Sequence, residues 1–198
     1  MAERIYTIPV NETFEVKDGC PICRLRDILE ERALEYILGP AMMESDVRLE
    51  TNKKGFCKEH FFMLTKKKSR LPLALIMETH LEEVSKNIKK KKARPDKKEI
   101  KSGSIEDKSC YICDRIEWSK ERMYATIAKL YSEEMDFRSL FREQTDICYT
   151  HYRELHAYSA PKISSKWRSE FEKDVDTLTL KAVNKLHDEV NYFTKMFD

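Results

Sequence analysis

The chain has 198 residues, of which 36% are charged and only four are glycine, and its formal net charge is +2. This composition favours long solvated helices over a fold with many tight turns. No stretch approaches the roughly 18 apolar residues of a membrane-spanning helix, and the first residues, MAERIYTIPV, lack the apolar segment of a signal peptide. We therefore expect a soluble cytoplasmic protein with no membrane contact, where cysteines more often bind metals or do redox chemistry than form disulfides.

The first half of the chain is predicted to be helical after a short N-terminal segment. RIYTIPV, residues 4–10, is rich in β-branched residues and predicts a short extended strand. Apolar residues then recur at helical spacing up to Ile37, and Gly39-Pro40 predicts the end of that helix. Further helices are predicted at 41–50, from about Phe56 with Cys57 and His60 in the first turn, and after Pro72.

The second half repeats this order. Helices are predicted over 114–131 and 133–143, followed by CYTH at 148–151 and a long helix capped by Ser164 or Ser165. Roughly 30 residues at about 1.5 Å each make the last helix about 45 Å long. Because it overhangs a small domain, its far end is expected to pack on the first half or on another chain, for example as a homodimer.

The two halves are copies of one pattern. CPIC at 20–23 and CKEH at 57–60 reappear as CYIC at 110–113 and CYTH at 148–151, and every cysteine belongs to this pattern. A shift of 90 residues gives nine identities over the 29 positions 20–48. We infer an internal duplication with modules at 1–84 and 110–198.

A basic segment separates the copies. Residues 1–84 carry 13 basic and 15 acidic residues, residues 85–109 carry 10 and 4, and residues 110–198 carry 14 and 16. The middle segment therefore holds all the excess positive charge, and it also contains Pro95 and Ser102-Gly103-Ser104. A solvated linker is the simplest interpretation of residues 85–109.

Each copy offers a complete set of zinc ligands. A CxxC turn directs two thiolates at one ion, and a CxxH in a first helical turn adds two donors on one face. Such a Cys3His set leaves no open position, which is typical of structural zinc. We predict two zinc ions per chain, one held by each copy, in an all-α tandem repeat. The predicted ligands are Cys20, Cys23, Cys57 and His60 in the first copy, and Cys110, Cys113, Cys148 and His151 in the second.

The same cysteines have alternative interpretations as a redox pair, as disulfides or as iron–sulfur ligands. CPIC resembles the CPxC of thioredoxin-like proteins, but no βαβ pattern surrounds it and the second copy has Tyr111 in place of Pro21. Disulfides and an iron–sulfur cluster are the remaining alternatives, since cysteine with an occasional histidine can hold a cluster. His156 is an alternative to His151 as a ligand, and His80 and His187 are surface histidines or members of a second, carboxylate-rich metal site.

These features favour a binding protein or scaffold over an enzyme. The sequence has no Gly-rich phosphate loop, GxSxG elbow or HExxH motif, and no credible Ser/His/Asp set. Protein partners are the first expectation. Nucleic acid is the rival through the basic stretches 66–70 and 86–101, and a redox-responsive or metal-responsive protein is the third reading.

Several segments also carry a family resemblance. YTIPVNETFE, CPICRL, YILGPAMMESDVRLETNKKGFCKEH and LPLALIMETHLEE resemble an uncharacterised family of roughly 200-residue proteins from anaerobic, clostridia-like bacteria. The likeness covers essentially the whole chain and implies a bacterial cytosolic protein. It implies no activity, so the eight predicted ligands depend on spacing and duplication.

Overall fold

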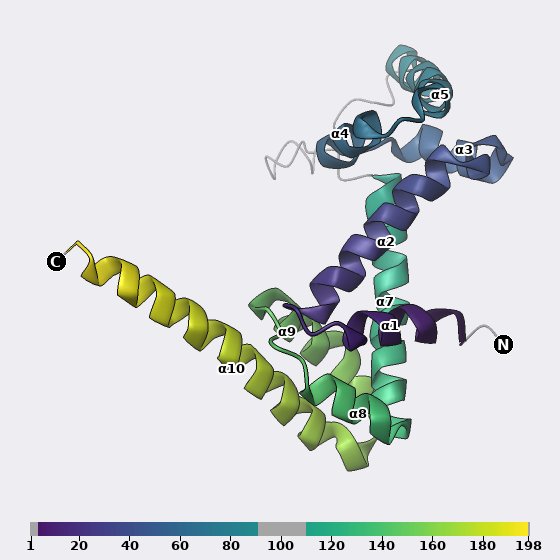
Figure 1. Cartoon of the computed structure of the whole chain (residues 1–198). Helices are drawn as coiled ribbons and strands as arrows, with labels where there is room; N and C mark the ends of the chain where they lie inside the picture. The colour runs from purple at the N-terminus through teal and green to yellow at the C-terminus, as the bar shows by residue number, and fades with distance from the viewer. Residues whose placement is uncertain (1–3, 91–109, 198) are drawn as a thin grey trace. The chain divides into compact units, whose positions relative to one another are not determined.

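A computed structural model describes residues 4–90 and 110–197, and these residues form helices and no strand. The predicted all-α class is confirmed. The chain divides into two compact units (Figure 1). Unit 1 comprises Met1–Leu29 and Trp118–Asp198, and unit 2 comprises Glu30–Glu117. None of the described helices is both long enough and apolar enough to cross a membrane.

Unit 1 is built around an aromatic core. Phe14, Tyr131, Phe141 and Phe171 are all fully buried, and Tyr131 and Phe171 meet edge-on with their ring centroids 5.0 Å apart. The helices that contribute to this unit are α1 (Arg4–Glu15), the start of α2 (Pro21–Leu38), the later part of α7 (Tyr111–Glu133), α8 (Met135–Arg142), α9 (Tyr149–Glu154) and α10 (Ser165–Lys195). A π-helical turn, Leu155–Ser159, and a 3-10 turn, Ala160–Lys162, connect α9 to α10.

The N-terminal segment is a helix, so the predicted strand at 4–10 is wrong. The buried residues of α1 are Pro9, Val10, Thr13 and Phe14, and the last three share one helical face. Burial of this face in the core of unit 1 outweighs both the β-branched composition and Pro9 inside the helix.

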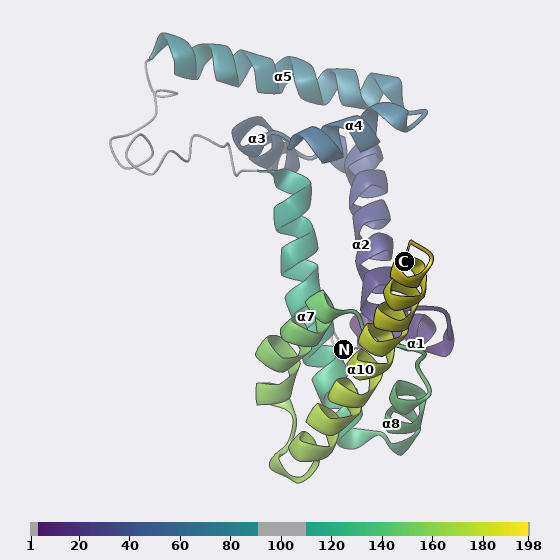
Figure 2. The same cartoon turned by 90° about the vertical axis from the view of Figure 1, so that its left-hand side faces the viewer.

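Unit 2 has a smaller aliphatic core. Leu34 and Ile37 of α2 pack with Leu64, Ile76 and Ile112. The elements of this unit are the end of α2, a 3-10 turn (Pro40–Met43), α3 (Ser45–Lys54), α4 (Lys58–Lys66), α5 (Arg70–Lys89) and the start of α7. Figure 2 shows α5 running beside α3 and α4.

The units do not coincide with the sequence copies. The predicted modules at 1–84 and 110–198 each contribute residues to both units, and the boundaries fall inside α2 and α7. The physical reason is helix length, since the 18 residues of α2 span about 27 Å without a break. The start of the predicted 85–109 linker continues α5 to Lys89, and residues 91–109 lie outside the described residues.

Candidate metal centres

The structure brings the eight predicted ligands together in two groups of four, but each group draws on both sequence copies. Within each group the four donor atoms lie within 4.8 Å of one another. The unit 1 site is formed by Cys20, Cys23, Cys148 and His151, and the unit 2 site by Cys57, His60, Cys110 and Cys113. The predicted sets within single copies are therefore wrong, although the residues themselves were correctly chosen for such clusters.

Helix geometry explains this exchange. In the first copy, Cys20 directly precedes α2 and Cys23 lies in its first turn. The CxxH of the same copy, residues 57–60, follows the other end of that helix. Between Leu38 and Cys57 the chain has only the 3-10 turn and the 10 residues of α3, which are too short to return along α2. The CxxH of the first copy therefore groups with the CxxC at the start of α7. The CxxH of the second copy, at the start of α9, groups with the CxxC at the start of α2.

In the unit 1 site three sulfurs surround one imidazole nitrogen. Nδ1 of His151 lies 3.5 Å from Sγ of Cys20, 3.3 Å from Sγ of Cys23 and 3.1 Å from Sγ of Cys148. The sulfurs of Cys23 and Cys148 are 3.7 Å apart. A tetrahedral zinc ion with bonds of about 2.3 Å to sulfur and 2.0–2.1 Å to nitrogen requires separations of roughly 3.8 Å between sulfurs and 3.5 Å from sulfur to nitrogen. The donor positions fit such an ion closely.

The unit 2 site repeats this arrangement. Nδ1 of His60 lies 3.1 Å from Sγ of Cys57, 3.4 Å from Sγ of Cys110 and 3.3 Å from Sγ of Cys113. The sulfurs of Cys57 and Cys113 are 3.9 Å apart. In both sites the nitrogen that faces the sulfurs is Nδ1, so the two copies also share the same donor atom of the histidine.

Helix starts present all the donors. Cys57 and Cys148 are the N-cap residues of α4 and α9, and the two CxxC pairs stand at the starts of α2 and α7. The partial positive charge of a helix N-terminus favours the thiolate form, which is the metal ligand.

Burial makes three of these thiols, those of Cys20, Cys23 and Cys113, harder to ionise by raising their pKa values. Burial, followed by the charge of Cys20, raises the pKa of Cys23 well above its usual value, and burial raises the pKa of Cys113 to about 12. Burial also lowers the pKa of His151, which favours the neutral imidazole that binds metals. A bound cation would therefore favour the thiolate forms of Cys23 and Cys113.

Carboxylates contact the outer ring nitrogens, and the sequence alone gave no sign of them. Nε2 of His60 lies 3.0 Å from Oε1 of Glu30, whose side chain is 19% exposed. In unit 1, Nε2 of His151 lies 3.8 Å from Oε2 of Glu154, which also binds Lys120. A carboxylate on the far nitrogen fixes the tautomer and orientation of a metal-binding histidine.

The other predicted candidates lie outside both groups. His156 has its Nε2 3.3 Å from Oδ1 of Asp176 and its ring against Tyr152, so it does not replace His151. His80 binds the backbone oxygen of Asn52, and His187 is exposed.

The basic stretch at 66–70 lies at the end of α4 and the start of α5. Lys66 sits over the ring of Phe62, and Lys67 pairs with Glu31. Two of its cations therefore already have partners within unit 2. Most of the second basic stretch, 86–101, lies outside the described residues.

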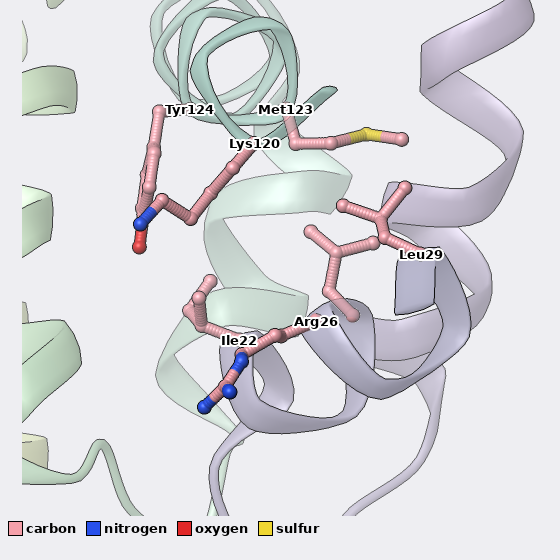
Figure 3. Close-up of a pocket in the computed structure, with 7 residues that line it drawn as sticks. Ile22, Arg26, Leu29, Lys120, Met123 and Tyr124 are labelled. Carbon is pink, nitrogen blue, oxygen red and sulfur yellow. The ribbon is translucent and has the colours of Figure 1, made fainter. Parts of the chain in front are cut away.

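A small cavity lies near the unit 1 site, between α2 and α7 (Figure 3). It measures about 10 Å³, room for at most one water, whereas small-molecule sites usually measure about 300–1,000 Å³. We therefore interpret this cavity as a small packing defect between the two helices and not as a ligand site. Its lining residues are Ile22, Leu25, Arg26, Leu29, Lys120, Met123 and Tyr124.

Comparison with known proteins identifies a family without assigning an activity. One family model, described as "Family of unknown function (DUF6062)", matches residues 1–198. No curated protein and no solved structure matches the chain.

Proposed function

The chain belongs to DUF6062, and we propose that it is a zinc-binding protein with two structural Cys3His sites. The observation that carries the proposal is the closed geometry of the donors, four to a site at tetrahedral separations. A site with four protein donors has no position for substrate or water, in contrast to catalytic zinc sites with three protein ligands.

Zinc is the ion that best fits this donor chemistry. Three thiolates and one imidazole are soft to borderline ligands, and a tetrahedral arrangement of sulfur and nitrogen is typical of zinc. An iron–sulfur cluster also accepts cysteine and histidine ligands. The mutual closeness of all four donor atoms, which lie within 4.8 Å of one another in each site, favours a single ion, because ligands on different irons of a cluster are held farther apart.

The role proposed for the metal is to join distant parts of the chain. In unit 1 the ligands come from residues 20–23 and 148–151, and in unit 2 from residues 57–60 and 110–113. Structural zinc contributes about 10–16 kcal/mol of apparent binding free energy at neutral pH, and that energy stabilises the folded state.

Around this framework we propose a non-enzymatic scaffold that binds other proteins. Its exposed apolar side chains on several helices support an interaction role, for example Phe62 on α4, Trp118 on α7 and Phe193 on α10. The reducing cytoplasm of a bacterium, which the family resemblance implies, suits thiolate–metal sites.

Elemental analysis of the full-length protein as purified tests the proposal. We expect two zinc ions per chain, a colourless solution and no charge-transfer absorption between about 400 and 500 nm. A variant with all six cysteines changed to serine controls for adventitious metal and should retain none. Stoichiometric iron with sulfide, or metal-free protein with unchanged helicity and melting temperature, would overturn it.

A further inference from the structure

The C-terminal helix α10 has two parts with different surroundings. Its first part packs in the core of unit 1 through Phe171, Val175 and Leu178, which are at most 2% exposed. Beyond Thr179 none of the described residues is buried, although the helix continues to Lys195. Figure 1 shows this end of α10 running away from α8 and α9. An isolated helix of this length is marginal in water, because most helical stability comes from packing an apolar face.

The exposed part carries an apolar stripe with coiled-coil spacing. Its members follow one another at alternating steps of three and four residues and are between 45% and 75% exposed. We call it the heptad stripe, and it consists of Val183, Leu186, Val190 and Phe193 on α10 together with Phe197, which lies two residues beyond the last helical residue. With Val183 at position a of the heptad, the a positions of α10 hold Val183 and Val190, and the d positions hold Leu186 and Phe193. Phe197 follows Val190 by one heptad, just after the helix ends at Lys195.

This pattern fits an identical helix. Valine at a with leucine at d favours two-stranded parallel coiled coils, in which each a residue meets its own counterpart. A pairing of this kind is isologous, so one stripe supplies both sides of the interface. Phe193 and Phe197, whose ring centroids lie 4.9 Å apart, close the C-terminal end of the stripe.

The charges along this helix permit self-association. Lys181, Asp188 and Lys195 occupy the f positions, and Lys185 a c position, all on the outer side of a coiled coil. Among the flanking e and g positions only Glu189 carries a full charge, and in a parallel pair it faces Thr194 of the other copy. No like charges therefore oppose one another across the seam.

The exposed area is also sufficient for a modest dimer. Five side chains, each about half exposed or more, present roughly 500 Å² of apolar surface per copy, given about 150–250 Å² for each aromatic residue. A symmetric pair would bury about 1,000 Å², which is near the lower limit of specific interfaces.

We propose that the heptad stripe of α10 binds the same stripe of a second copy of this chain as a parallel, in-register two-stranded coiled coil. The interface goes beyond the proposed metal-binding function and does not depend on it, because none of the metal ligands lies on α10.

Sedimentation velocity of the full-length, metal-loaded protein, in reductant and over about 1–200 μM, tests the proposal. We expect a concentration-dependent monomer–dimer equilibrium for the wild type. Val190→Glu places two carboxylates against each other in the seam and should weaken the dimer at least ~100-fold. Asn191→Glu adds the same charge at the next residue, a b position on the outer side, and should leave the dimer intact.

Mixing two charged variants tests the orientation. In a parallel, in-register pair Val190 meets Val190 of the other copy, so equal amounts of Val190→Glu and Val190→Lys should restore a dimer that neither variant forms alone. In an antiparallel pair Val190 would meet Leu186, and the rescuing mixture would be Val190→Glu with Leu186→Lys. Rescue by that mixture alone overturns the parallel arrangement.

Two further outcomes would overturn the dimer itself. A wild-type protein that stays monomeric up to about 200 μM would overturn the dimer. If the monomeric Val190→Glu variant then melts at a lower temperature than the wild type, the stripe packs within its own chain. A dimer that Val190→Glu leaves unchanged places the interface elsewhere. Unchanged circular dichroism and zinc content of both variants show that the fold is intact, because position 190 is 53% exposed in one chain.

Discussion

Oε1 of Glu30 lies 3.0 Å from Nε2 of His60, while Nδ1 of the same imidazole faces the three sulfurs of the unit 2 site. The side chain of His60 is 7% exposed and that of Glu30 is 19% exposed. The carboxylate therefore accepts a hydrogen bond from Nε2–H, and the lone pair of Nδ1 faces the sulfurs. Unit 1 lacks so direct a contact, since His151 and Glu154 are 3.8 Å apart.

Replacing Glu30 should weaken the unit 2 site selectively. Glu30→Gln keeps the size of the side chain but removes the charge that orients His60 through its Nε2. We expect a 10–100-fold loss of metal affinity at one of the two sites, the usual effect of such outer partners. Competition with a chromogenic chelator, followed as two release steps, would measure it.

Glu31→Gln is the matched control for that experiment. Glu31 is the next residue of α2 and pairs with Lys67 at the surface, where its side chain is 48% exposed. Exposed ion pairs contribute about 0–1 kcal/mol, so this variant should bind metal as the wild type does. Equal metal release from both variants would argue against a specific role of Glu30.

The exchange of ligands between the copies can be tested by counting metal ions. Cys20 and Cys148 share the unit 1 site, whereas Cys20 and Cys57 belong to different sites. The double variant Cys20→Ser/Cys148→Ser should therefore keep one ion, and Cys20→Ser/Cys57→Ser should keep neither after dialysis against a weak chelator. Elemental analysis of both variants, prepared in parallel with the wild type, distinguishes the two cases.

Ligand sets within single copies would give the reverse result. In that arrangement Cys20 and Cys57 would share one ion, so their double variant would keep the other. Both variants carry two Cys→Ser changes, so the comparison controls for the loss of two thiols. Retention of one ion in Cys20→Ser/Cys57→Ser would contradict the structure.

The members of the two Cys3His clusters could be predicted from the sequence, but their grouping could not. Duplication singled out all six cysteines together with His60 and His151, because spacing and recurrence are visible in one sequence. The grouping depends on whether the chain returns along α2 after Leu38, and that follows from the lengths of α2 and α3. The 10 residues of α3 cannot bring the chain back along the 18 residues of α2.

The carboxylates near the histidines were missed because the duplication does not preserve them. The position in the second copy that matches Glu30 is Lys120, which binds Glu154 instead of a histidine. Glu154 also accepts a hydrogen bond from Tyr124, and although burial opposes its ionisation, these donors lower its pKa. Each histidine therefore has a carboxylate nearby from a different element, but only Glu30 lies within hydrogen-bond distance of its histidine.

Metal removal should destabilise both units. The thiol groups of each site would be left close together and partly desolvated, with raised pKa values at Cys23 and Cys113. We expect a high-affinity chelator to reduce the free energy of unfolding by an amount on the order of 10 kcal/mol, the scale of structural zinc binding. Thermal unfolding followed by circular dichroism at 222 nm would show it, with re-addition of zinc as the control. Identical melting curves with and without chelator would contradict a structural role.

Gly55→Ala should be strongly destabilising for unit 2. Gly55 follows α3 with φ of 62° and ψ of −153°, a conformation that is essentially restricted to glycine. A Cβ at this position would lie 2.7 Å from Cε1 and 2.8 Å from Nε2 of His80. The imidazole cannot move aside easily, because its Nδ1 lies 2.9 Å from the backbone oxygen of Asn52 in a hydrogen bond.

The same substitution should also disturb the unit 2 site. The backbone oxygen of Gly55 accepts a hydrogen bond of 3.1 Å from the amide of Tyr111, the residue after the ligand Cys110. We expect a loss of about 2–4 kcal/mol in the free energy of unfolding, from backbone strain and steric overlap together, and weaker metal binding at one site. Gly19→Ala is the control, because Gly19 also has a positive φ, 67°, but no atom within 4 Å of the added Cβ. It should lose only about 1 kcal/mol, so chemical denaturation that ranks the two variants equally would contradict the role of the His80 contact.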